Sequence, residues 1–136
     1  MKNSQLSTLN SQLLSPLPKG PLWTKSFVFA LRVVKLAKHL QGEKKEYVLS
    51  RQVLRSGTAI GALVREAEHA ESRADFSHKM NIALKEANET LYWLELLYGG
   101  DYVSAKSFES IKKDSEELVK LLVSIVSTTK RSLRAQ

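Results

Sequence analysis

The sequence contains no cysteine and only six glycines and three prolines among its 136 residues. The absence of cysteine excludes disulfides and thiolate metal sites, and it suits a reducing compartment, so we expect a cytoplasmic protein. All three prolines, Pro16, Pro18 and Pro21, lie near the N-terminus, so no proline interrupts a helix further along. No apolar run approaches the ~18 residues of a membrane helix, and the first residues lack the basic and apolar order of a signal peptide.

Sequence motifs for catalysis are missing as well. The chain has no Gly-x-Ser-x-Gly string, and Gly57 and Gly61 are not preceded by a strand as a phosphate-binding loop requires. No histidine lies on a predicted inner face, which removes the usual base for nucleophilic catalysis. We therefore expect no enzymatic activity and no cofactor.

Two short strings have the spacing of carboxylate–histidine metal ligands. Glu66 and His69 form a Glu-x-x-His unit, and Asp75 and His78 repeat the spacing with an aspartate. The neighbouring Ala67 and Phe76 occupy core positions, which turns these side chains outward, and the other helices offer no inward glutamates. A metalloenzyme using Glu66, His69 and His78 is therefore an alternative that we keep only for testing, and we expect no metal site.

Apolar residues recur at steps of three and four residues along four stretches of the chain, which predicts amphipathic helices. Ser72 and Ser104 are good N-terminal caps, and Gly42 and the pair Gly99–Gly100 are stop signals. The fold class predicted is all-α, an antiparallel up-down-up-down four-helix bundle over residues 23–134 behind a flexible leader, residues 1–22. The expected helices run from Thr24 or Ser26 to Gln41, about 46–70, from after Ser72 to about 98, and from after Ser104 to about 133.

The second helix organises the predicted core. Gly57 and Gly61 lie one turn apart, beside its apolar stripe. Each glycine inside a helix costs about 1 kcal/mol relative to alanine. We interpret them as a site of close helix packing against the small residues of the third helix, with a weak or kinked helix as the alternative. The core stripes expected are Leu49, Val53, Ser56, Ile60, Leu63 and Ala67 in the second helix; Phe76, Met80, Ala83, Ala87, Thr90, Leu94 and Leu97 in the third; and Phe108, Ile111, Ser115, Leu118, Leu122, Ile125 and Thr129 in the fourth.

The first and fourth helices carry more apolar surface than one bundle face needs. In the first helix, one stripe contains Phe27, Leu31, Val34 and Ala37, and a second contains Phe29, Val33, Leu36 and Leu40. A contiguous exposed apolar surface is a liability on a monomer, so we predict a homo-oligomer built through these two helices, the alternative being that the leader covers them. The interface residues expected are Phe29, Val33, Leu36, Val119, Val123 and Val126.

Positive charge exceeds negative charge by seven, and the excess is uneven. The first helix has four cations and no acid, and the tail after Thr129 is basic. A basic balance makes nucleic acid a plausible partner, although a solvated basic face that only aids solubility is the alternative. We expect the cations at the end of the fourth helix to approach the start of the first. The predicted nucleic-acid contacts are Lys25, Arg32, Lys35, Lys38, Lys130, Arg131 and Arg134.

The central part of the chain resembles a known bacterial family. The segment RSGTAIGALVREAEHAESRADFSHKMNIALKEANETLYWLELL is similar to the four-helix-bundle proteins encoded within intervening sequences of 23S ribosomal RNA genes. The resemblance is most specific at Arg55–Ser56, Ile60–Gly61, Glu66–Ala67, Leu84–Ala87, Glu89–Thr90 and Tyr92–Leu94, whereas Ala59 and Leu63 depart from the family pattern.

The resemblance implies an antiparallel four-helix bundle, a homopentameric ring and no known catalytic activity. The same family includes the accessory variability proteins of diversity-generating retroelements, which bind nucleic acid and a reverse transcriptase through a basic surface. A non-enzymatic oligomer that binds structured RNA or RNA/DNA is therefore the function we expect. A protein–protein adaptor or scaffold, for example for a reverse transcriptase, is the alternative.

Overall fold

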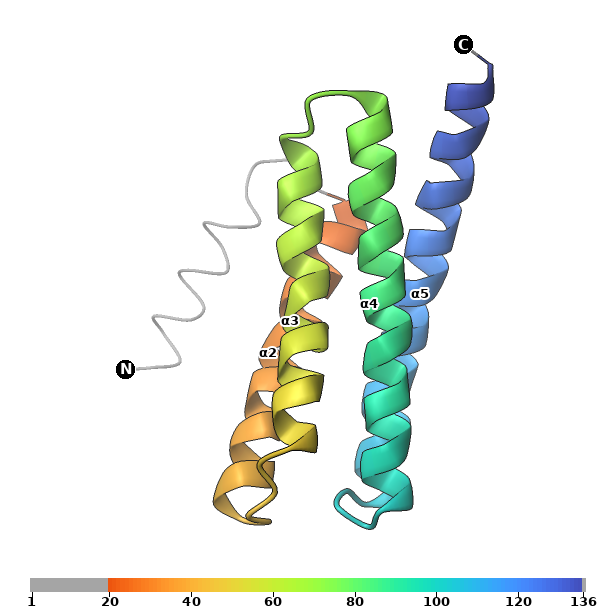
Figure 1. Cartoon of the computed structure of the whole chain (residues 1–136). Helices are drawn as coiled ribbons and strands as arrows, with labels where there is room; N and C mark the ends of the chain where they lie inside the picture. The colour runs from red at the N-terminus through yellow and green to blue at the C-terminus, as the bar shows by residue number, and fades with distance from the viewer. Residues whose placement is uncertain (1–19, 136) are drawn as a thin grey trace.

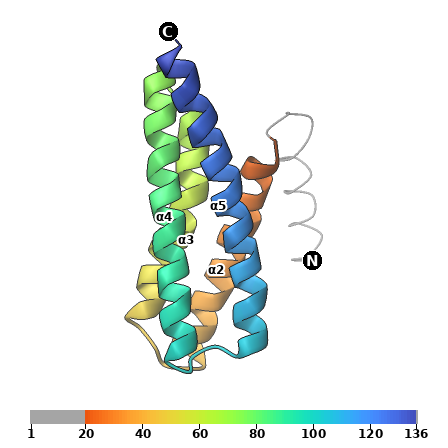
Figure 2. The ribbon, with the colours of Figure 1, turned by 90° about the vertical axis from the view of Figure 1, so that its right-hand side faces the viewer.

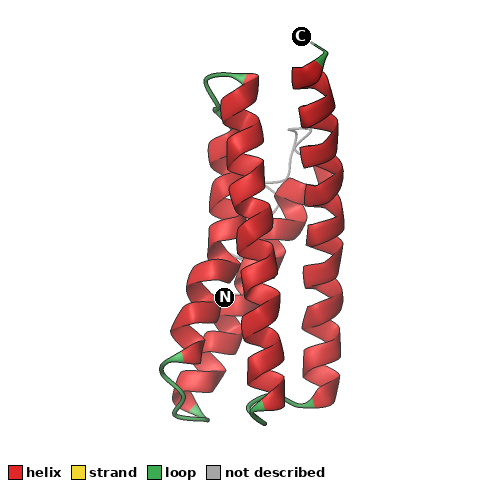
Figure 3. Cartoon of the chain, turned by 45° about the vertical axis from the view of Figure 1, so that its right-hand side comes forward, coloured by secondary structure: helices red, strands yellow, loops and turns green. Residues whose placement is uncertain are grey.

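The computed structural model describes residues 20–135, and all the regular secondary structure in that range is helical. The helices are α2 (Gly20–Gly42), α3 (Leu49–Glu68), α4 (Arg73–Gly99) and α5 (Ala105–Arg134), in that order (Figures 1 and 3). Each helix runs antiparallel to the one before it, and short turns join them (Figure 1). This arrangement confirms the predicted all-α up-down bundle. None of the helices between residues 20 and 135 combines the length and the apolar content needed to cross a membrane.

The first helix begins earlier than its capping residues predict. α2 starts at Gly20, which has a φ of 73°, and Pro21 follows in the first turn, where its missing N–H costs nothing. Leu22 and Trp23 are buried in this turn, so residues 20–22 belong to the bundle and not to the leader. The rest of the predicted leader, residues 1–19, lies outside the described range.

Serine caps begin the last two helices, as the sequence predicts. The Ser72 hydroxyl accepts a hydrogen bond from the backbone N–H of Asp75 (3.0 Å), and the Asp75 carboxylate accepts one from the N–H of Glu71 (3.2 Å). The Ser104 hydroxyl accepts from the N–H of Ser107 (3.2 Å) at the start of α5. These contacts satisfy N–H groups that have no partner within the helix.

The cap of α3 was not predicted. Glu46, which is only 8% exposed, lies before the first turn of α3. Its carboxylate accepts hydrogen bonds from the backbone N–H groups of Val48 (3.1 Å), Leu49 (2.9 Å) and Ser50 (2.7 Å). Burial would raise the pKa of the Glu46 carboxyl, but these hydrogen bonds and the Ser50 side chain outweigh burial and hold that pKa below its ordinary value. A negative charge at this helix N-terminus is favourable, which fixes the α2–α3 turn.

Replacing Glu46 with glutamine is expected to lower the free energy of unfolding by about 1–2 kcal/mol near neutral pH. Because the folded pKa lies below the unfolded pKa, the stabilisation is complete above the unfolded pKa and is lost as pH falls through the folded pKa. Urea unfolding of the wild type and Glu46→Gln at neutral and acidic pH measures this. The difference between the two proteins should shrink in acid, and a difference that is the same at both pH values would contradict the assignment.

The core lies along the facing sides of the four helices. In α4 the predicted stripe is buried except for Phe76, which is half-buried, and in α5 Val126 takes the core place expected for Ile125. The predicted stripes of α3, α4 and α5 each contain one buried hydroxyl residue, Ser56, Thr90 and Ser115. Thr90 Oγ1 lies 2.9 Å from Ser56 Oγ, so this pair links α4 to α3. The fully buried side chains of the core include Phe29, Leu40, Ile60, Leu94, Leu97, Leu118 and Leu122.

The two glycines of α3 mark a close approach to α2, not to α4. A Cβ added at Gly57 would lie 2.8 Å from Cγ2 of Val33, closer than packed atoms allow. At Gly61 the nearest atom would be the backbone oxygen of Ser26 at 3.4 Å, which is ordinary contact. The expectation that the small residues of α4 fill this space was therefore wrong. The buried contact of α3 with α4 includes instead the hydrogen bond between Thr90 and Ser56.

The structure corrects part of the predicted oligomer interface. Phe29 is 1% exposed, Val33 is 0% exposed and Val126 is 6% exposed within one chain, so none of them can reach a second copy. In α2 the stripe with Phe29 and Val33 is the core, because it is the one that faces α3 and its glycines. Of the other stripe, Phe27, Leu31 and Val34 are half-buried, whereas Ala37 is buried with the core. Of the six interface residues predicted, Val123 is 45% exposed, and Leu36 and Val119 are half-buried.

Candidate nucleic-acid interface

The line along which α2 faces α5, which we name the α2–α5 seam, is the weakest of the contacts between neighbouring helices. Lys25 Nζ lies 2.5 Å from a carboxylate oxygen of Glu117, and Arg32 Nη1 lies 2.5 Å from Oδ2 of Asp114. Arg32 also donates to the backbone oxygen (3.3 Å) and the hydroxyl (3.1 Å) of Ser110. These two cations therefore hold α5 against α2, and a carboxylate of α5 already compensates the charge of each.

Lys35 and Lys38 differ from Lys25 and Arg32, which precede them on α2. Both are exposed, and no ion pair is formed by either within residues 20–135. Lys44 and Lys45, in the turn that follows, are exposed as well, whereas Glu46 in the same turn is buried in its capping role. We name Lys35, Lys38, Lys44 and Lys45 the turn cluster. The turn itself contains one exposed carboxylate, that of Glu43.

Lys44 and Lys45 were missed by the sequence reasoning. Residues 43–46 are two lysines flanked by two glutamates, so the formal charges of this turn sum to zero. Only the structure shows that one of the acids, Glu46, points its charge at the N–H groups of α3. No pattern in the sequence signals this, because Glu46 lies three residues before the first residue of the helix, Leu49.

The cations at the end of α5 lie at the opposite end of the bundle from the turn cluster. Lys130, Arg131 and Arg134 are exposed in the last two turns. Arg73 at the start of α4 joins them, because its Nη1 donates to the Ser132 hydroxyl (3.1 Å). We name these four residues the C-terminal cluster. Figure 2 shows α5 ending beside the start of α4, beyond the point where α2 begins.

This placement corrects the expectation that the end of α5 approaches the start of α2. α5 is 30 residues long and α2 is 23, so the last turns of α5 extend past α2 and pack beside α4. The seven predicted cations consequently do not form one surface. Two of them bridge the α2–α5 seam, two belong to the turn cluster and three to the C-terminal cluster.

The suggested metal ligands are not brought together. Glu66 accepts from Lys79 Nζ at 3.3 Å, and Asp75 serves the cap of α4. His69 and His78 are both exposed. Within residues 20–135 there is no group of three or more histidine, aspartate or glutamate side chains placed to hold a metal ion.

An arginine stacked between helices is a further feature of the α2–α3 contact. The guanidinium of Arg65 lies 4.3 Å from the ring centroid of Trp23 and 5.1 Å from that of Phe27. This contact covers the first turns of α2 and stabilises them by a cation–π interaction. Arg65 is half-buried against these rings, so we do not count its charge among those available to a polyanion.

On the other face of α3, a polar network joins α4. Arg55 Nη1 lies 3.2 Å from Oε2 of Glu86, and Nη2 of Arg55 pairs with Glu89. The Glu89 carboxylate also accepts from the indole N–H of Trp93 at 3.0 Å. These contacts join four residues, Arg55 of α3 and Glu86, Glu89 and Trp93 of α4, within one chain, so we assign them no contact with a partner.

Comparison with known proteins agrees with the fold. Residues 19–124 match the model of the 23S rRNA-intervening sequence protein family. A crystal structure of a protein of unknown function from the S23 ribosomal protein family of Bacteroides thetaiotaomicron is 56% identical and superposes with a TM-score of 0.79. The match covers 82% of this chain and 99% of that one. Among curated proteins there is no match. The helical bundle, the matched range and this identity together place the chain in the 23S rRNA-intervening sequence protein family.

Proposed function

We propose that the chain is a non-enzymatic nucleic-acid-binding protein that acts as a homo-oligomer, a pentameric ring, and binds structured RNA or RNA/DNA. The observation that carries the proposal is the pair of exposed basic clusters at the two ends of a chain with a net charge of +7. Phosphate contacts require only such cations, and they supply affinity without sequence selectivity. A ring would place several copies of each cluster around one axis and multiply the field that attracts a polyanion.

Exposed apolar residues on α2 and α5 support assembly. Val123 on α5 is 45% exposed and Val28 on α2 is 48% exposed. Leu36 on α2 and Val119 on α5 are half-buried, so part of each side chain is accessible. Leu36, Val119 and Val123 are the predicted interface residues that remain accessible, and Val28 is added to them in place of the buried Phe29, Val33 and Val126. Sedimentation of the purified protein at micromolar concentration should show a species several times the mass of one chain, which is 15.3 kDa. A single-chain species across that range would contradict assembly.

Binding of RNA should weaken steeply with salt. If Lys35 and Lys38 alone each neutralise one phosphate, raising salt from about 50 to about 200 mM should lower the affinity about tenfold, and more contacts should lower it further. An electrophoretic titration of a structured RNA at the two salt concentrations measures this. The absence of binding at both concentrations would contradict the proposal, and binding that does not change with salt would contradict its electrostatic basis.

A protein partner, such as a reverse transcriptase, is the second candidate. Tyr92 and Leu96 lie one turn apart on α4 and are 55% and 38% exposed, which gives α4 an apolar contact surface that the bundle does not use. A complex with the reverse transcriptase that survives nuclease treatment and is lost in Tyr92→Ser/Leu96→Ser would favour this function over nucleic-acid binding.

A further inference from the structure

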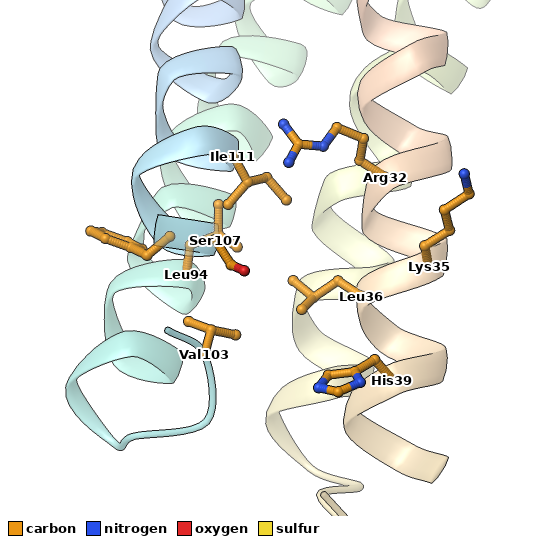
Figure 4. Close-up of a pocket in the computed structure, with 9 residues that line it drawn as sticks. Arg32, Lys35, Leu36, His39, Leu94, Val103, Ser107 and Ile111 are labelled. Atoms are coloured by element: carbon orange, nitrogen blue, oxygen red, sulfur yellow. The ribbon is translucent and has the colours of Figure 1, made fainter. Parts of the chain in front are cut away.

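A cavity of about 450 Å³ opens in the lower part of the α2–α5 seam, between the Arg32 bridge and the α4–α5 turn. Figure 4 shows Leu36 projecting from α2 toward Ile111 of α5, with Val103 below them. Leu94 of α4 and Phe108 of α5 complete the apolar walls. The volume lies within the range of small-molecule pockets, and the space between helices of a bundle is a usual place for one.

Three of the apolar wall residues are packed into the core of the bundle. Leu94 is 0% exposed, Phe108 is 5% exposed and Ile111 is 7% exposed, so each is held by the core behind it. Arg32 lies at the upper end, where its guanidinium is hydrogen-bonded to Asp114 and Ser110. The ring of Tyr98 stacks on that of Phe108, with 4.5 Å between the ring centroids. The cavity is therefore formed by the packing of the bundle itself.

The rim of the cavity carries basic side chains. Lys35 and His39 lie on the α2 side, and Ser107 lies on the α5 side. No acidic residue is among the residues that line it. A neighbouring hollow continues the space toward the α4–α5 turn, where Lys44 adds a cation and Asp101 adds a carboxylate. Figure 4 shows the His39 ring at the mouth of the cavity and the Lys35 ammonium farther out, on the α2 side.

We infer that this cavity binds a small amphipathic anion, an apolar chain or ring that carries one carboxylate. The apolar walls suit the body of such a molecule, since burial removes its surface from water. The carboxylate would remain at the mouth, where Lys35 supplies a positive charge and the His39 imidazole can donate an N–H. A neutral apolar molecule would leave the rim charges unused, and a large polyanion could not enter. This activity goes beyond nucleic-acid binding and requires no second copy of the chain.

Decanoate is a suitable probe for the full-length protein, because it joins one apolar chain to one carboxylate. Methyl signals of Leu36, Leu94, Val103 and Ile111 in isotope-labelled protein should shift saturably as decanoate is added below its micelle concentration. Decanol, which keeps the chain and lacks the charge, should bind at least tenfold more weakly, and acetate should produce no shift. Saturable shifts confined to other methyl groups, or equal binding of decanol, would overturn the inference.

Variants separate the two parts of the site. Ser107→Trp places a large side chain in the mouth and should lower decanoate affinity at least tenfold. The double variant Lys35→Glu/His39→Glu should lower it to a similar extent. Lys38→Glu is the matched control, since Lys38 is exposed on the same helix and does not line the cavity. Lys38→Glu should change decanoate affinity less than twofold while it weakens RNA binding, so the two proposals can fail independently.

If Ser107→Trp unfolds, as circular dichroism would show, the wild-type methyl shifts and the rim variants still decide the question. Unchanged binding in a folded Ser107→Trp protein would overturn the inference. So would the absence of any saturable shift up to millimolar decanoate, including the case in which a neighbouring copy in an oligomer already fills the cavity.

Discussion

Replacing Gly57 with leucine is expected to destabilise the bundle by about 3 kcal/mol or more. Even the first carbon of a side chain would lie 2.8 Å and 2.9 Å from the two γ carbons of Val33. Val33 cannot yield, because it is 0% exposed and its branched side chain has essentially one rotamer in a helix. The two helices would have to separate along their contact, and the aromatic contacts of Arg65 would separate with them.

Gly61→Ala is the matched control for this prediction. Its added carbon would meet the backbone oxygen of Ser26 at 3.4 Å, and alanine gains about 1 kcal/mol of helix propensity over glycine. We therefore expect Gly61→Ala to be neutral or slightly stabilising in urea unfolding, while Gly57→Leu is unfolded or strongly destabilised. If both variants are as stable as the wild type, α2 does not approach α3 as closely as described.

Reversing the charge of two residues in the turn cluster, as in Lys35→Glu/Lys38→Glu, is expected to weaken RNA binding at least tenfold at low salt. Each lysine that contacts a phosphate releases about one counterion, so the slope of log affinity against log salt should fall by about 2 per chain. Arg32 and Lys25 are unsuitable for this test, because their reversal would also break the bridges to Asp114 and Glu117. Electrophoretic titration over several salt concentrations measures both quantities.

The control for charge reversal is Lys85→Glu/Lys120→Glu. Both lysines are exposed outside the two clusters, and this variant changes the net charge by the same amount. If RNA responds only to net charge, the two variants will weaken binding equally, which would contradict a site at the turn cluster. A larger loss in Lys35→Glu/Lys38→Glu, with unchanged circular dichroism, supports it. If both variants bind RNA as the wild type does, the turn cluster is not the binding site, and the C-terminal cluster becomes the candidate.

The helices and their order could be predicted from sequence, because the information is local. The 4-3-4 spacing from Met80 to Leu97 places one side of α4 in the core whatever its neighbours are. The caps Ser72 and Ser104 act on N–H groups within three residues of themselves, so their role could also be predicted. The family resemblance rests on the same local strings, and the matched range confirms it.

The choice between two candidate stripes in α2 required the tertiary structure. Phe27 and Phe29 are both apolar residues in a helix with apolar residues on most sides, so periodicity does not select one of them. The selection depends on where Gly57 lies, since Val33 fits against a residue without a side chain. Because this stripe packs against α3, Phe29 and Val33 are buried and cannot belong to the predicted oligomer surface.

The distribution of charge also depended on contacts between distant residues. Lys25 and Arg32 look the same as Lys35 and Lys38 in sequence, yet only the first two lie opposite carboxylates of α5. The lengths of α2 and α5 could be predicted approximately, but where the end of α5 lies depends on how it packs beside α4. Local spacing thus determined which segments are helices, and packing between helices decided which side chains are buried, which charges are paired and where a cavity remains.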